Sequence, residues 1–206
     1  MFKRKKAKTN SKDPEFLRSI CLNSESVYQY FWNSSQLGND NKKFSTNELL
    51  PVISLITKNY DIQVAAEYGT AQCRVSSALI MGGVKTLYSV DIEKDQVVDH
   101  FYELTKDTGC NFIFENIDSA KYNLPKVDLL FIDSLDNREH LAKELKLHTR
   151  VKKLILLHDT ETFKDVGDEG GNLEVEINSF LKQNSEWKIL YKFVHNNGLT
   201  VLEKIE

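Results

Sequence analysis

Two apolar runs in the second half of the sequence end in side chains that can bind a metal ion. VDLLFID ends at Asp133, Asp136 follows three residues later, and KLILLHD ends at His158 and Asp159. Hard divalent cations prefer oxygen ligands, and carboxylates that converge from adjacent strands can hold such an ion. We therefore predict a metal site among these four side chains.

Asp136 and His158 are the candidate catalytic bases. An ion that holds a substrate hydroxyl lowers the pKa of that hydroxyl, so that an adjacent base can take its proton. The alternative for His158 is a core histidine with a satisfied ring nitrogen, but its place beside Asp159 at a strand end favours a function. The remaining histidines lack such a context and are expected on the surface or in loops: His100, His140, His148 and His195.

A second set of side chains, earlier in the chain, suits an adenosine-containing ligand. Glu67 and Gly69 form a turn after a short apolar run, Asp91 lies 22 residues after Gly69, and Asp118 follows a third run. Glycine lets a backbone approach a ligand closely, and Glu67 suits a cationic group such as the ammonium of a methionine moiety. An acid at the distance of Asp91 typically binds ribose hydroxyls, and Asp118 can meet the adenine amino group.

Each of these residues also has an ordinary interpretation, as a tight turn or as a helix cap. Their occurrence at three successive strand ends favours S-adenosylmethionine (SAM), with Asp133 as a further cofactor contact. A dinucleotide site requires G-x-G-x-x-G, whereas this turn contains only Gly69. A nicotinamide-dependent oxidoreductase is therefore disfavoured.

An alternation of strands and helices must position these residues. Apolar runs predict five strands, and helical periodicity predicts the helices between and after them: strands 62–67, 87–92, 111–117, 127–132 and 154–157, and helices 74–81, 97–108, around 141–145, and 173–181. Asn197-Gly198 between two alternating runs predicts a final hairpin of residues 187–194 and 199–205. We expect an α/β, Rossmann-like sheet of seven strands, mostly parallel with an antiparallel C-terminal hairpin, and helices on both faces.

Three regions are expected along the chain: a disordered basic tail over 1–12, an N-terminal helical cap over 13–60, and the sheet domain over 61–206. Asp13-Pro14 predicts one helix start, and Ser45 with Glu48 resembles a capping box. Because Pro51 conflicts with an unbroken helix from Ser45, that helix is expected to begin near Leu50. The glycine-rich acidic loop 164–171 is either part of a substrate pocket, a lid, or a plain surface loop.

Composition is that of an ordinary globular protein of 206 residues, 41% hydrophobic and 28% charged. No apolar run approaches the ~20 residues of a membrane span, and three scattered cysteines suggest free thiols in a reducing compartment, so we expect a cytoplasmic protein. Residues 1–12 carry six basic side chains, which leaves 21 basic and 30 acidic residues in the remainder, a balance of −9. Because this part of the protein is negatively charged, nucleic acid is a poor partner.

Three segments resemble a branch of the class I SAM-dependent methyltransferases related to the cephalosporin hydroxylase-like and macrocin O-methyltransferase groups. They are LLFIDSLDNREHLAKEL, LILLHDTETF and WKILYKFVHNNGLTVLEK, and the resemblance covers residues 62–205. It implies a divalent ion, magnesium or manganese, on Asp133 and on the pair His158-Asp159. Histidine replaces an oxygen ligand of related enzymes there, which favours softer ions than magnesium.

The chain departs from this branch just after Asp133. The branch often has Leu-His-Thr-Tyr where this sequence has Leu135-Asp136-Asn137-Arg138. Either Asp136 takes over as base or ligand, or activity toward the usual substrates is lost. We expect an O-methyltransferase that methylates a hydroxyl of a small polar acceptor, a sugar or a secondary metabolite. No membrane partner is expected, and a homo-oligomer is possible. The alternatives are a non-catalytic SAM-binding protein and, through the basic tail, nucleic-acid methylation.

Overall fold

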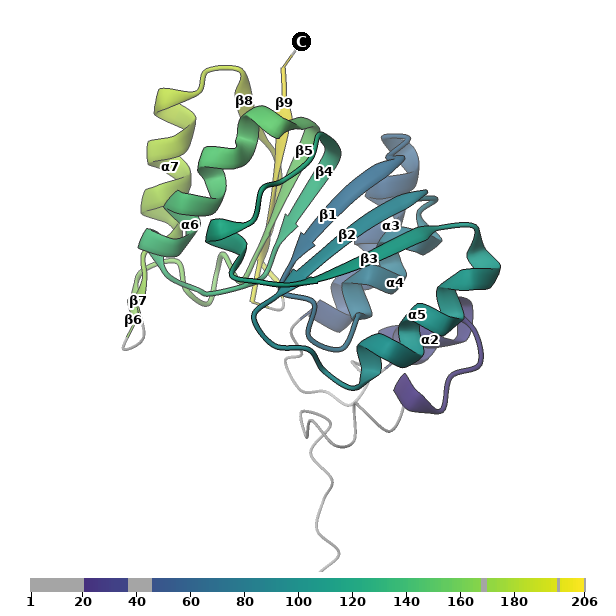
Figure 1. The fold of residues 1–206 in the computed structure, drawn as a ribbon. Coiled ribbons are helices and arrows are strands. Elements are labelled where there is room, and N and C mark those ends of the chain that lie inside the picture. The colour runs from purple at the N-terminus through teal and green to yellow at the C-terminus, as the bar shows by residue number, and fades with distance from the viewer. Residues whose placement is uncertain (1–20, 37–45, 168–169, 196, 206) are drawn as a thin grey trace, which may run out of the picture.

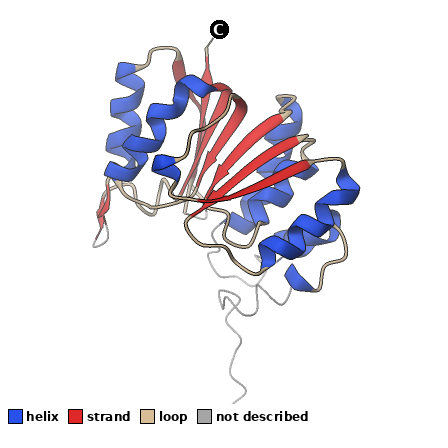
Figure 2. Ribbon diagram, in the orientation of Figure 1, coloured by secondary structure: helices blue, strands red, loops and turns tan. Residues whose placement is uncertain are grey.

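The structure, a computed structural model, describes residues 21–36, 46–167, 170–195 and 197–205. A twisted sheet lies between two layers of helices (Figures 1 and 2). The basic tail, the helix start at Asp13-Pro14 and the capping residue Ser45 lie outside the described residues. None of the helices in the described part of the chain has the length and apolar composition needed to span a bilayer.

The main sheet has seven strands in the order β3-β2-β1-β4-β5-β9-β8. Their bounds are β1 Val64–Tyr68, β2 Thr86–Asp91, β3 Asn111–Asn116, β4 Val127–Ile132, β5 Val151–His158, β8 Trp187–Phe193 and β9 Leu199–Lys204. The first five strands are parallel, β9 runs antiparallel to β5, and β8 runs antiparallel to β9. This confirms the predicted sheet and its C-terminal hairpin.

The central strand β4 is buried at all six positions, as expected for a parallel strand covered on both faces. Its one acid, Asp128, accepts hydrogen bonds from the backbone N–H groups of Gln63 and Val64, both at 3.0 Å, and pairs with Lys152 at 3.1 Å. These contacts tie the start of β4 to both neighbouring strands. The β5 strand begins three residues before its predicted start and includes Lys152 and Lys153, which bind the Asp128 carboxylate and the Tyr60 carbonyl.

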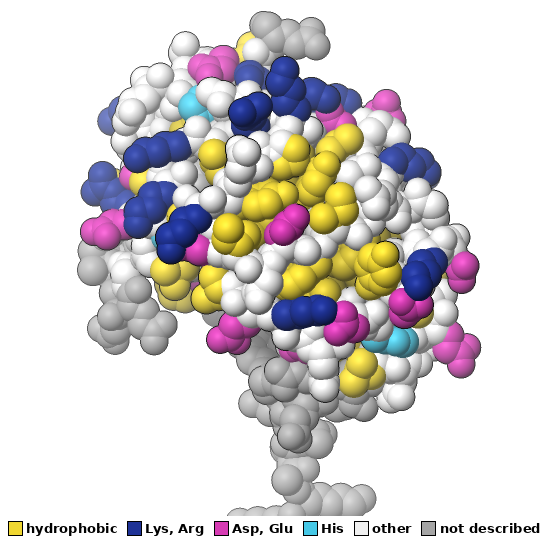
Figure 3. Space-filling view, viewed as in Figure 1, with side chains coloured by type: hydrophobic (Ala, Val, Ile, Leu, Met, Phe, Trp, Pro, Cys, Tyr) yellow, Lys and Arg dark blue, Asp and Glu magenta, His cyan; other side chains and the backbone are white. Residues whose placement is uncertain are grey.

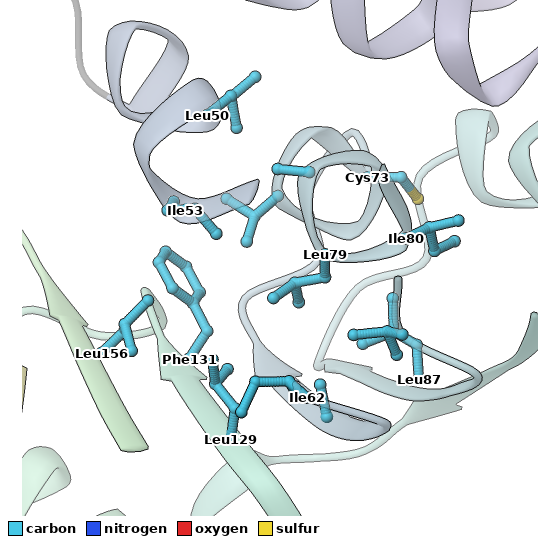
Figure 4. Close-up of a cluster of buried hydrophobic side chains, with 14 of the residues drawn as sticks. Leu50, Ile53, Ile62, Cys73, Leu79, Ile80, Leu87, Leu129, Phe131 and Leu156 are labelled. Atoms are coloured by element: carbon cyan, nitrogen blue, oxygen red, sulfur yellow. The ribbon is translucent and has the colours of Figure 1, made fainter. Parts of the chain in front are cut away.

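The helices pack in two groups, one on each face. One group comprises α2 Val27–Gln36, α3 Leu50–Asn59, α4 Arg74–Met81 and α5 Val97–Thr105; the other comprises α6 Arg138–Leu145 and α7 Leu173–Gln183. Leu50 and Ile53 of α3 pack with Leu79 of α4 and Phe131 of β4 in one buried cluster (Figure 4). The described part of the predicted N-terminal cap is thus part of a helix layer, and α3 begins at Leu50, as Pro51 indicated.

No helix connects β3 to β4 in this sheet; residues 117–126 contain only the short 3-10 helix η3 (Ser119–Lys121). Apolar side chains consequently gather on the open face where β1 to β3 lie (Figure 3), with Val64, Tyr88 and Tyr122 only partly buried. Asp118 follows the end of β3 by two residues and therefore lies at the carboxyl edge of the sheet, in the same cavity as other predicted site residues.

Residue 69 must be a glycine because the backbone of the loop after β4 lies against it. Asp133 N–H donates to the Tyr68 carbonyl at 2.8 Å, which brings the two strand ends together. Gly69 has a φ of +89°, and a Cβ there would lie 1.9 Å from the Asp133 carbonyl oxygen. Close approach to a ligand was the reason inferred from sequence; the nearest constraint is instead the loop that follows β4.

Gly69→Ala is expected to destabilise the protein more than a matched glycine substitution. Gly109 also has a positive φ, +71°, but a Cβ there meets nothing within 4 Å. Gly109→Ala should therefore cost only the backbone strain, about 1–2 kcal/mol, whereas Gly69→Ala adds a steric clash and should cost about 3 kcal/mol or more. Urea unfolding of both variants measures the difference, and equal losses would contradict the role of the Asp133 contact.

Candidate functional site

A cavity of about 510 Å³ opens at the carboxyl ends of β1, β2 and β4 and beside the loop after β3. Its lining includes four of the predicted cofactor residues, Gly69, Asp91, Asp118 and Asp133. The parallel strands bring these residues to one edge although they are spread over 65 positions of the sequence. The volume suits a nucleoside-sized ligand.

Asp91 and Asp118 are both held by local hydrogen bonds. The Asp91 carboxylate accepts from the N–H groups of Ala71 at 3.0 Å and Glu93 at 3.1 Å, which fixes it at the cavity rim. Asp118 caps η3 and pairs with Lys121 at 3.2 Å. Slight burial disfavours its charge, but the bonds from Lys121 and Ala120 outweigh that effect and lower the pKa of Asp118. The carboxylate is thus a helix cap and a cavity residue at once.

Glu67 lies beneath the turn and does not line this cavity. Its side chain is 1% exposed and accepts hydrogen bonds from the hydroxyls of Ser76 and Ser89. Burial, opposed by these hydroxyls and assisted by the charge of Asp133, raises the pKa of Glu67 to about 8. Its predicted contact with a ligand ammonium therefore stays a prediction.

Asp133, His158 and Asp159 converge because β4 and β5 are in register. Ile132 pairs with Leu157, so the next residue along each strand faces its neighbour. His158 Nδ1 lies 3.0 Å from Asp133 Oδ1 and 3.2 Å from Asp159 Oδ1. One donor atom from each residue falls within 4.8 Å of the others.

This donor set fits a divalent cation. Two ligand atoms at right angles, each about 2.1 Å from one ion, are about 3 Å apart. The separations of His158 Nδ1 from the two carboxylate oxygens, 3.0 and 3.2 Å, match this value. Asp159 adopts a left-handed φ of +57°, and its carboxylate interacts with the side chain of Asn197 in the β8–β9 turn. The terminal hairpin therefore supports the cluster.

Asp136 adds a third carboxylate to the cluster. Burial, together with the charges of Asp159 and Asp133, raises the pKa of Asp136 to about 8. Burial likewise raises the pKa of Asp159. For His158 burial works the other way, but the neighbouring carboxylates outweigh it and raise its pKa. The site accumulates more negative charge than one imidazolium neutralises, which a bound cation would relieve.

Several residues of the site were not identified from sequence. His140, expected on the surface or in a loop, lines the large cavity, and its Nε2 lies 3.0 Å from Ser119 Oγ and 3.3 Å from Glu144 Oε1. Glu144 is fully buried. The only local signal was the spacing of His140 and Glu144, one helical turn apart.

The expectation for two other histidines was also wrong. His100 and His148 are partly buried, with ring nitrogens 2.8 Å from the carbonyl oxygens of Ser24 and Leu145. His195 is exposed, as expected. In both failures the partner is a backbone carbonyl, which residue type does not reveal.

No protein-family model matches this sequence, and no curated protein is similar to it in sequence. Solved structures are similar in fold. The O-methyltransferase TomG from Streptomyces achromogenes, in complex with SAM, has a TM-score of 0.60 and 12% identity over 94% of this chain and 96% of its own. The chain has the class I methyltransferase fold.

Two further methyltransferases, both solved with S-adenosylhomocysteine (SAH), agree. PaMTH1 from Podospora anserina gives a TM-score of 0.59 at 13% identity over 98% of this chain and 100% of its own. The magnesium protoporphyrin IX methyltransferase ChlM from Synechocystis PCC 6803 gives 0.58 at 14% identity over 94% of each chain. At these identities the likeness concerns the methyltransferase fold alone.

The stability of the metal-free protein is expected to fall between pH 5 and pH 8. Asp136 in the folded state keeps its proton up to a pKa of about 8, whereas the unfolded chain releases it near pH 4, so rising pH favours unfolding across this window. The raised pKa of His158 acts in the same direction, because its stabilisation is present at low pH and is lost as pH rises through the folded pKa.

Asp136→Asn should therefore stabilise the protein at pH 8 by at least about 1 kcal/mol and have a smaller effect at pH 5. Unfolding in the presence of a chelator measures this. Asp107→Asn, at an exposed acid in the short 3-10 helix η2 (Lys106–Thr108) that follows α5, is the control. If Asp136→Asn leaves the pH dependence of stability as it is in the original protein, the cluster repulsion is disproved.

Proposed function

We propose that the protein is a SAM-dependent methyltransferase that methylates a hydroxyl group on a small polar acceptor, a sugar or a secondary metabolite. The observation that carries this proposal is the position of Asp133, which both lines the large cavity and belongs to the acid cluster. A cofactor in the cavity and a substrate at the cluster would therefore be adjacent. The fold shared with SAM- and SAH-bound methyltransferases supports the choice of cofactor.

Different residues of the cavity would bind different parts of the cofactor. Asp91, held rigid by two backbone N–H groups, would accept hydrogen bonds from the ribose hydroxyls. Asp118 would meet the adenine amino group from the loop after β3. The positive φ of Gly69 lets the turn after β1 bend away, so that the methionine end can reach the region of Asp133.

Asp133, His158 and Asp159 would hold a divalent ion, which lowers the pKa of the acceptor hydroxyl and orients it. A donor set of two carboxylates and one imidazole favours manganese over magnesium. Asp136, with a pKa of about 8, would act as the general base in its ionised form and take the hydroxyl proton, so this step would become faster as the pH rises toward that value. The oxygen then forms its bond to the methyl carbon while the bond from that carbon to the sulfonium sulfur breaks.

The acceptor would enter beside the small hairpin β6 (Val166–Gly167) and β7 (Gly170–Gly171). A cavity of about 350 Å³ lies there, lined by Asn137, Arg138 and Gly171. Gly171 N–H donates to the Asp136 carbonyl at 3.1 Å, so the hairpin is joined directly to the segment that carries the proposed base. This is the loop for which the sequence left three possibilities: part of the acceptor pocket, a lid, or a plain surface loop.

Calorimetry with SAH tests the cofactor. The protein should bind SAH, and Asp91→Asn should weaken binding about tenfold or more, because a charged acceptor for two hydroxyl groups is lost. Asp99→Asn, an exposed acid on α5, is the matched control and should bind as the original protein does. Absence of heat with both SAH and SAM would refute the proposal.

Titration with Mn²⁺ in the presence of SAH tests the ion. Asp159→Asn should reduce the affinity for Mn²⁺ by 10-fold or more, since it removes an anionic ligand, while Asp107→Asn leaves it unchanged. Thermal unfolding at pH 8 supplies an independent readout, because Mn²⁺ should raise the midpoint of the original protein. Methyl transfer that persists in full after chelation would exclude a role for the ion.

A non-catalytic SAM-binding protein is the second candidate, and the segment after Asp133 favours it. Asn137 caps α6 through a bond from His140 N–H at 2.9 Å, and Arg138 pairs with Glu176 at 3.2 Å. Two positions that differ from the related branch are thus used structurally. Tight SAH binding without methyl transfer to a broad panel of hydroxylated acceptors would identify this function.

A further inference from the structure

His140 lines the 510 Å³ cavity, but the proposed function gives it no role. It lies in the first turn of α6, where its backbone N–H donates to the capping side chain of Asn137 at 2.9 Å. The same cavity wall contains Asp118, whose carboxylate is close enough for its charge to raise the pKa of His140. A carboxylate and an imidazole therefore lie side by side where the cofactor is proposed to bind.

One ring nitrogen of His140, Nε2, carries a hydrogen atom. Nε2 lies 3.0 Å from Ser119 Oγ and 3.3 Å from Glu144 Oε1. Ser119 has a single hydroxyl hydrogen, and it donates that hydrogen to Glu144 Oε1 at 2.5 Å. Both neighbours of Nε2 therefore offer only lone pairs to it, so Nε2 must be the donor.

The imidazole of His140 is the charge partner of a buried carboxylate. Glu144 is 0% exposed, and a carboxylate with this burial has to be paired and hydrogen-bonded. Glu144 also lines a small interior cavity of about 10 Å³ beside His158, but among the described residues it is His140 whose nitrogen lies within ion-pair distance. The hydrogen bond to Glu144 and the charges of Glu144 and Asp118 outweigh burial and raise the pKa of His140. His140 therefore carries a second hydrogen atom, on Nδ1.

Nδ1–H is the one hydrogen-bond donor that the described side chains offer to this cavity. None of the described residues accepts from Nδ1, and Nδ1 is not enclosed in the interior, so it is open to the cavity. The hydroxyls of Ser119 and Ser134 donate their hydrogens to Glu144, at 2.5 and 2.6 Å. The other polar side chains of the wall are carboxylates, which only accept hydrogen bonds. A ligand that satisfies this wall must place an acceptor atom at His140.

We propose that His140 Nδ1–H donates to a ring nitrogen of the cofactor's adenine, on an edge that carries the amino group. This inference rests on the proposed function, because it takes SAM as the ligand. Asp118 would accept from the amino group, and His140 on the same wall would meet the neighbouring acceptor, N1 or N7. A purine with a carbonyl group in place of the amino group would turn an acceptor toward Asp118. His140 and Asp118 together would therefore select adenine over hypoxanthine and guanine.

Calorimetry with deaza analogues of SAH tests this contact in the full-length protein. In 1-deaza-SAH and 7-deaza-SAH, a C–H group replaces one of the two candidate nitrogens. The control ligand is 3-deaza-SAH, because N3 lies on the edge of adenine away from the amino group. The original protein should bind one of the first two analogues about 10-fold or more weakly than SAH, because a hydrogen bond from a charged donor is lost.

His140→Gln removes the Nδ1 donor and keeps an amide NH₂ near the position of Nε2, so Glu144 retains a donor. This variant should bind SAH about 10-fold or more weakly than the original protein does. It should also no longer distinguish SAH from the analogue that the original protein binds weakly. His148→Gln is the matched control, at a partly buried histidine whose Nδ1 lies 2.8 Å from the Leu145 carbonyl oxygen. It should bind all four ligands as the original protein does.

Three results would overturn the contact. They are equal affinity of the original protein for SAH and for both the 1-deaza and 7-deaza analogues, losses with these analogues that persist in full in His140→Gln, and a loss dependent on His140 only with 3-deaza-SAH. The first needs no variant, and the second separates a contact from a structural role, which would weaken all ligands alike. Absence of SAH binding by the original protein would refute the proposed function and this contact together, whereas SAH binding that does not depend on His140 would refute the contact alone.

Discussion

The arrangement of the site depends on the register of β4 between its two neighbours. All six residues of β4 are buried, so apolar burial alone would tolerate a shift along the sheet. Asp128 removes that freedom, because its carboxylate is bound by two backbone N–H groups at the start of β1 and by Lys152 of β5. These bonds outweigh its burial and lower its pKa, so the charge that fixes the register is retained. The register fixed by Asp128 also determines which residues Asp133 meets at the other end of β4.

Fixing the strands in this way concentrates charge at their ends. Asp133, Asp136 and Asp159 surround one imidazole, and burial together with the neighbouring carboxylates raises the pKa values of Asp136 and Asp159. This repulsion reduces folding stability, and the proposed cation would relieve it. Asn197 contributes from the β8–β9 turn, so the last hairpin supports the cluster as well as completing the sheet.

The strands and the acids at their ends were predictable from sequence, because apolar runs and the residue that follows each run are local features. Glu144 was not. A glutamate on an amphipathic helix is normally solvated, and its burial depends on Ser119 and Ser134, hydroxyls supplied by two separate loops. His140 escaped notice for the same reason. The reason for a glycine at position 69 was not predictable either, because the carbonyl oxygen that excludes a side chain there belongs to Asp133, 64 residues further along the chain.

Glu144 joins the two halves of the site. One carboxylate oxygen holds Ser119 and Ser134, which belong to the wall of the large cavity. The other oxygen faces the small cavity that His158 also lines. A single buried carboxylate therefore connects the wall of the 510 Å³ cavity with the acid cluster, because it binds two serines of that wall and lies against Asp133 and His158 at the small cavity.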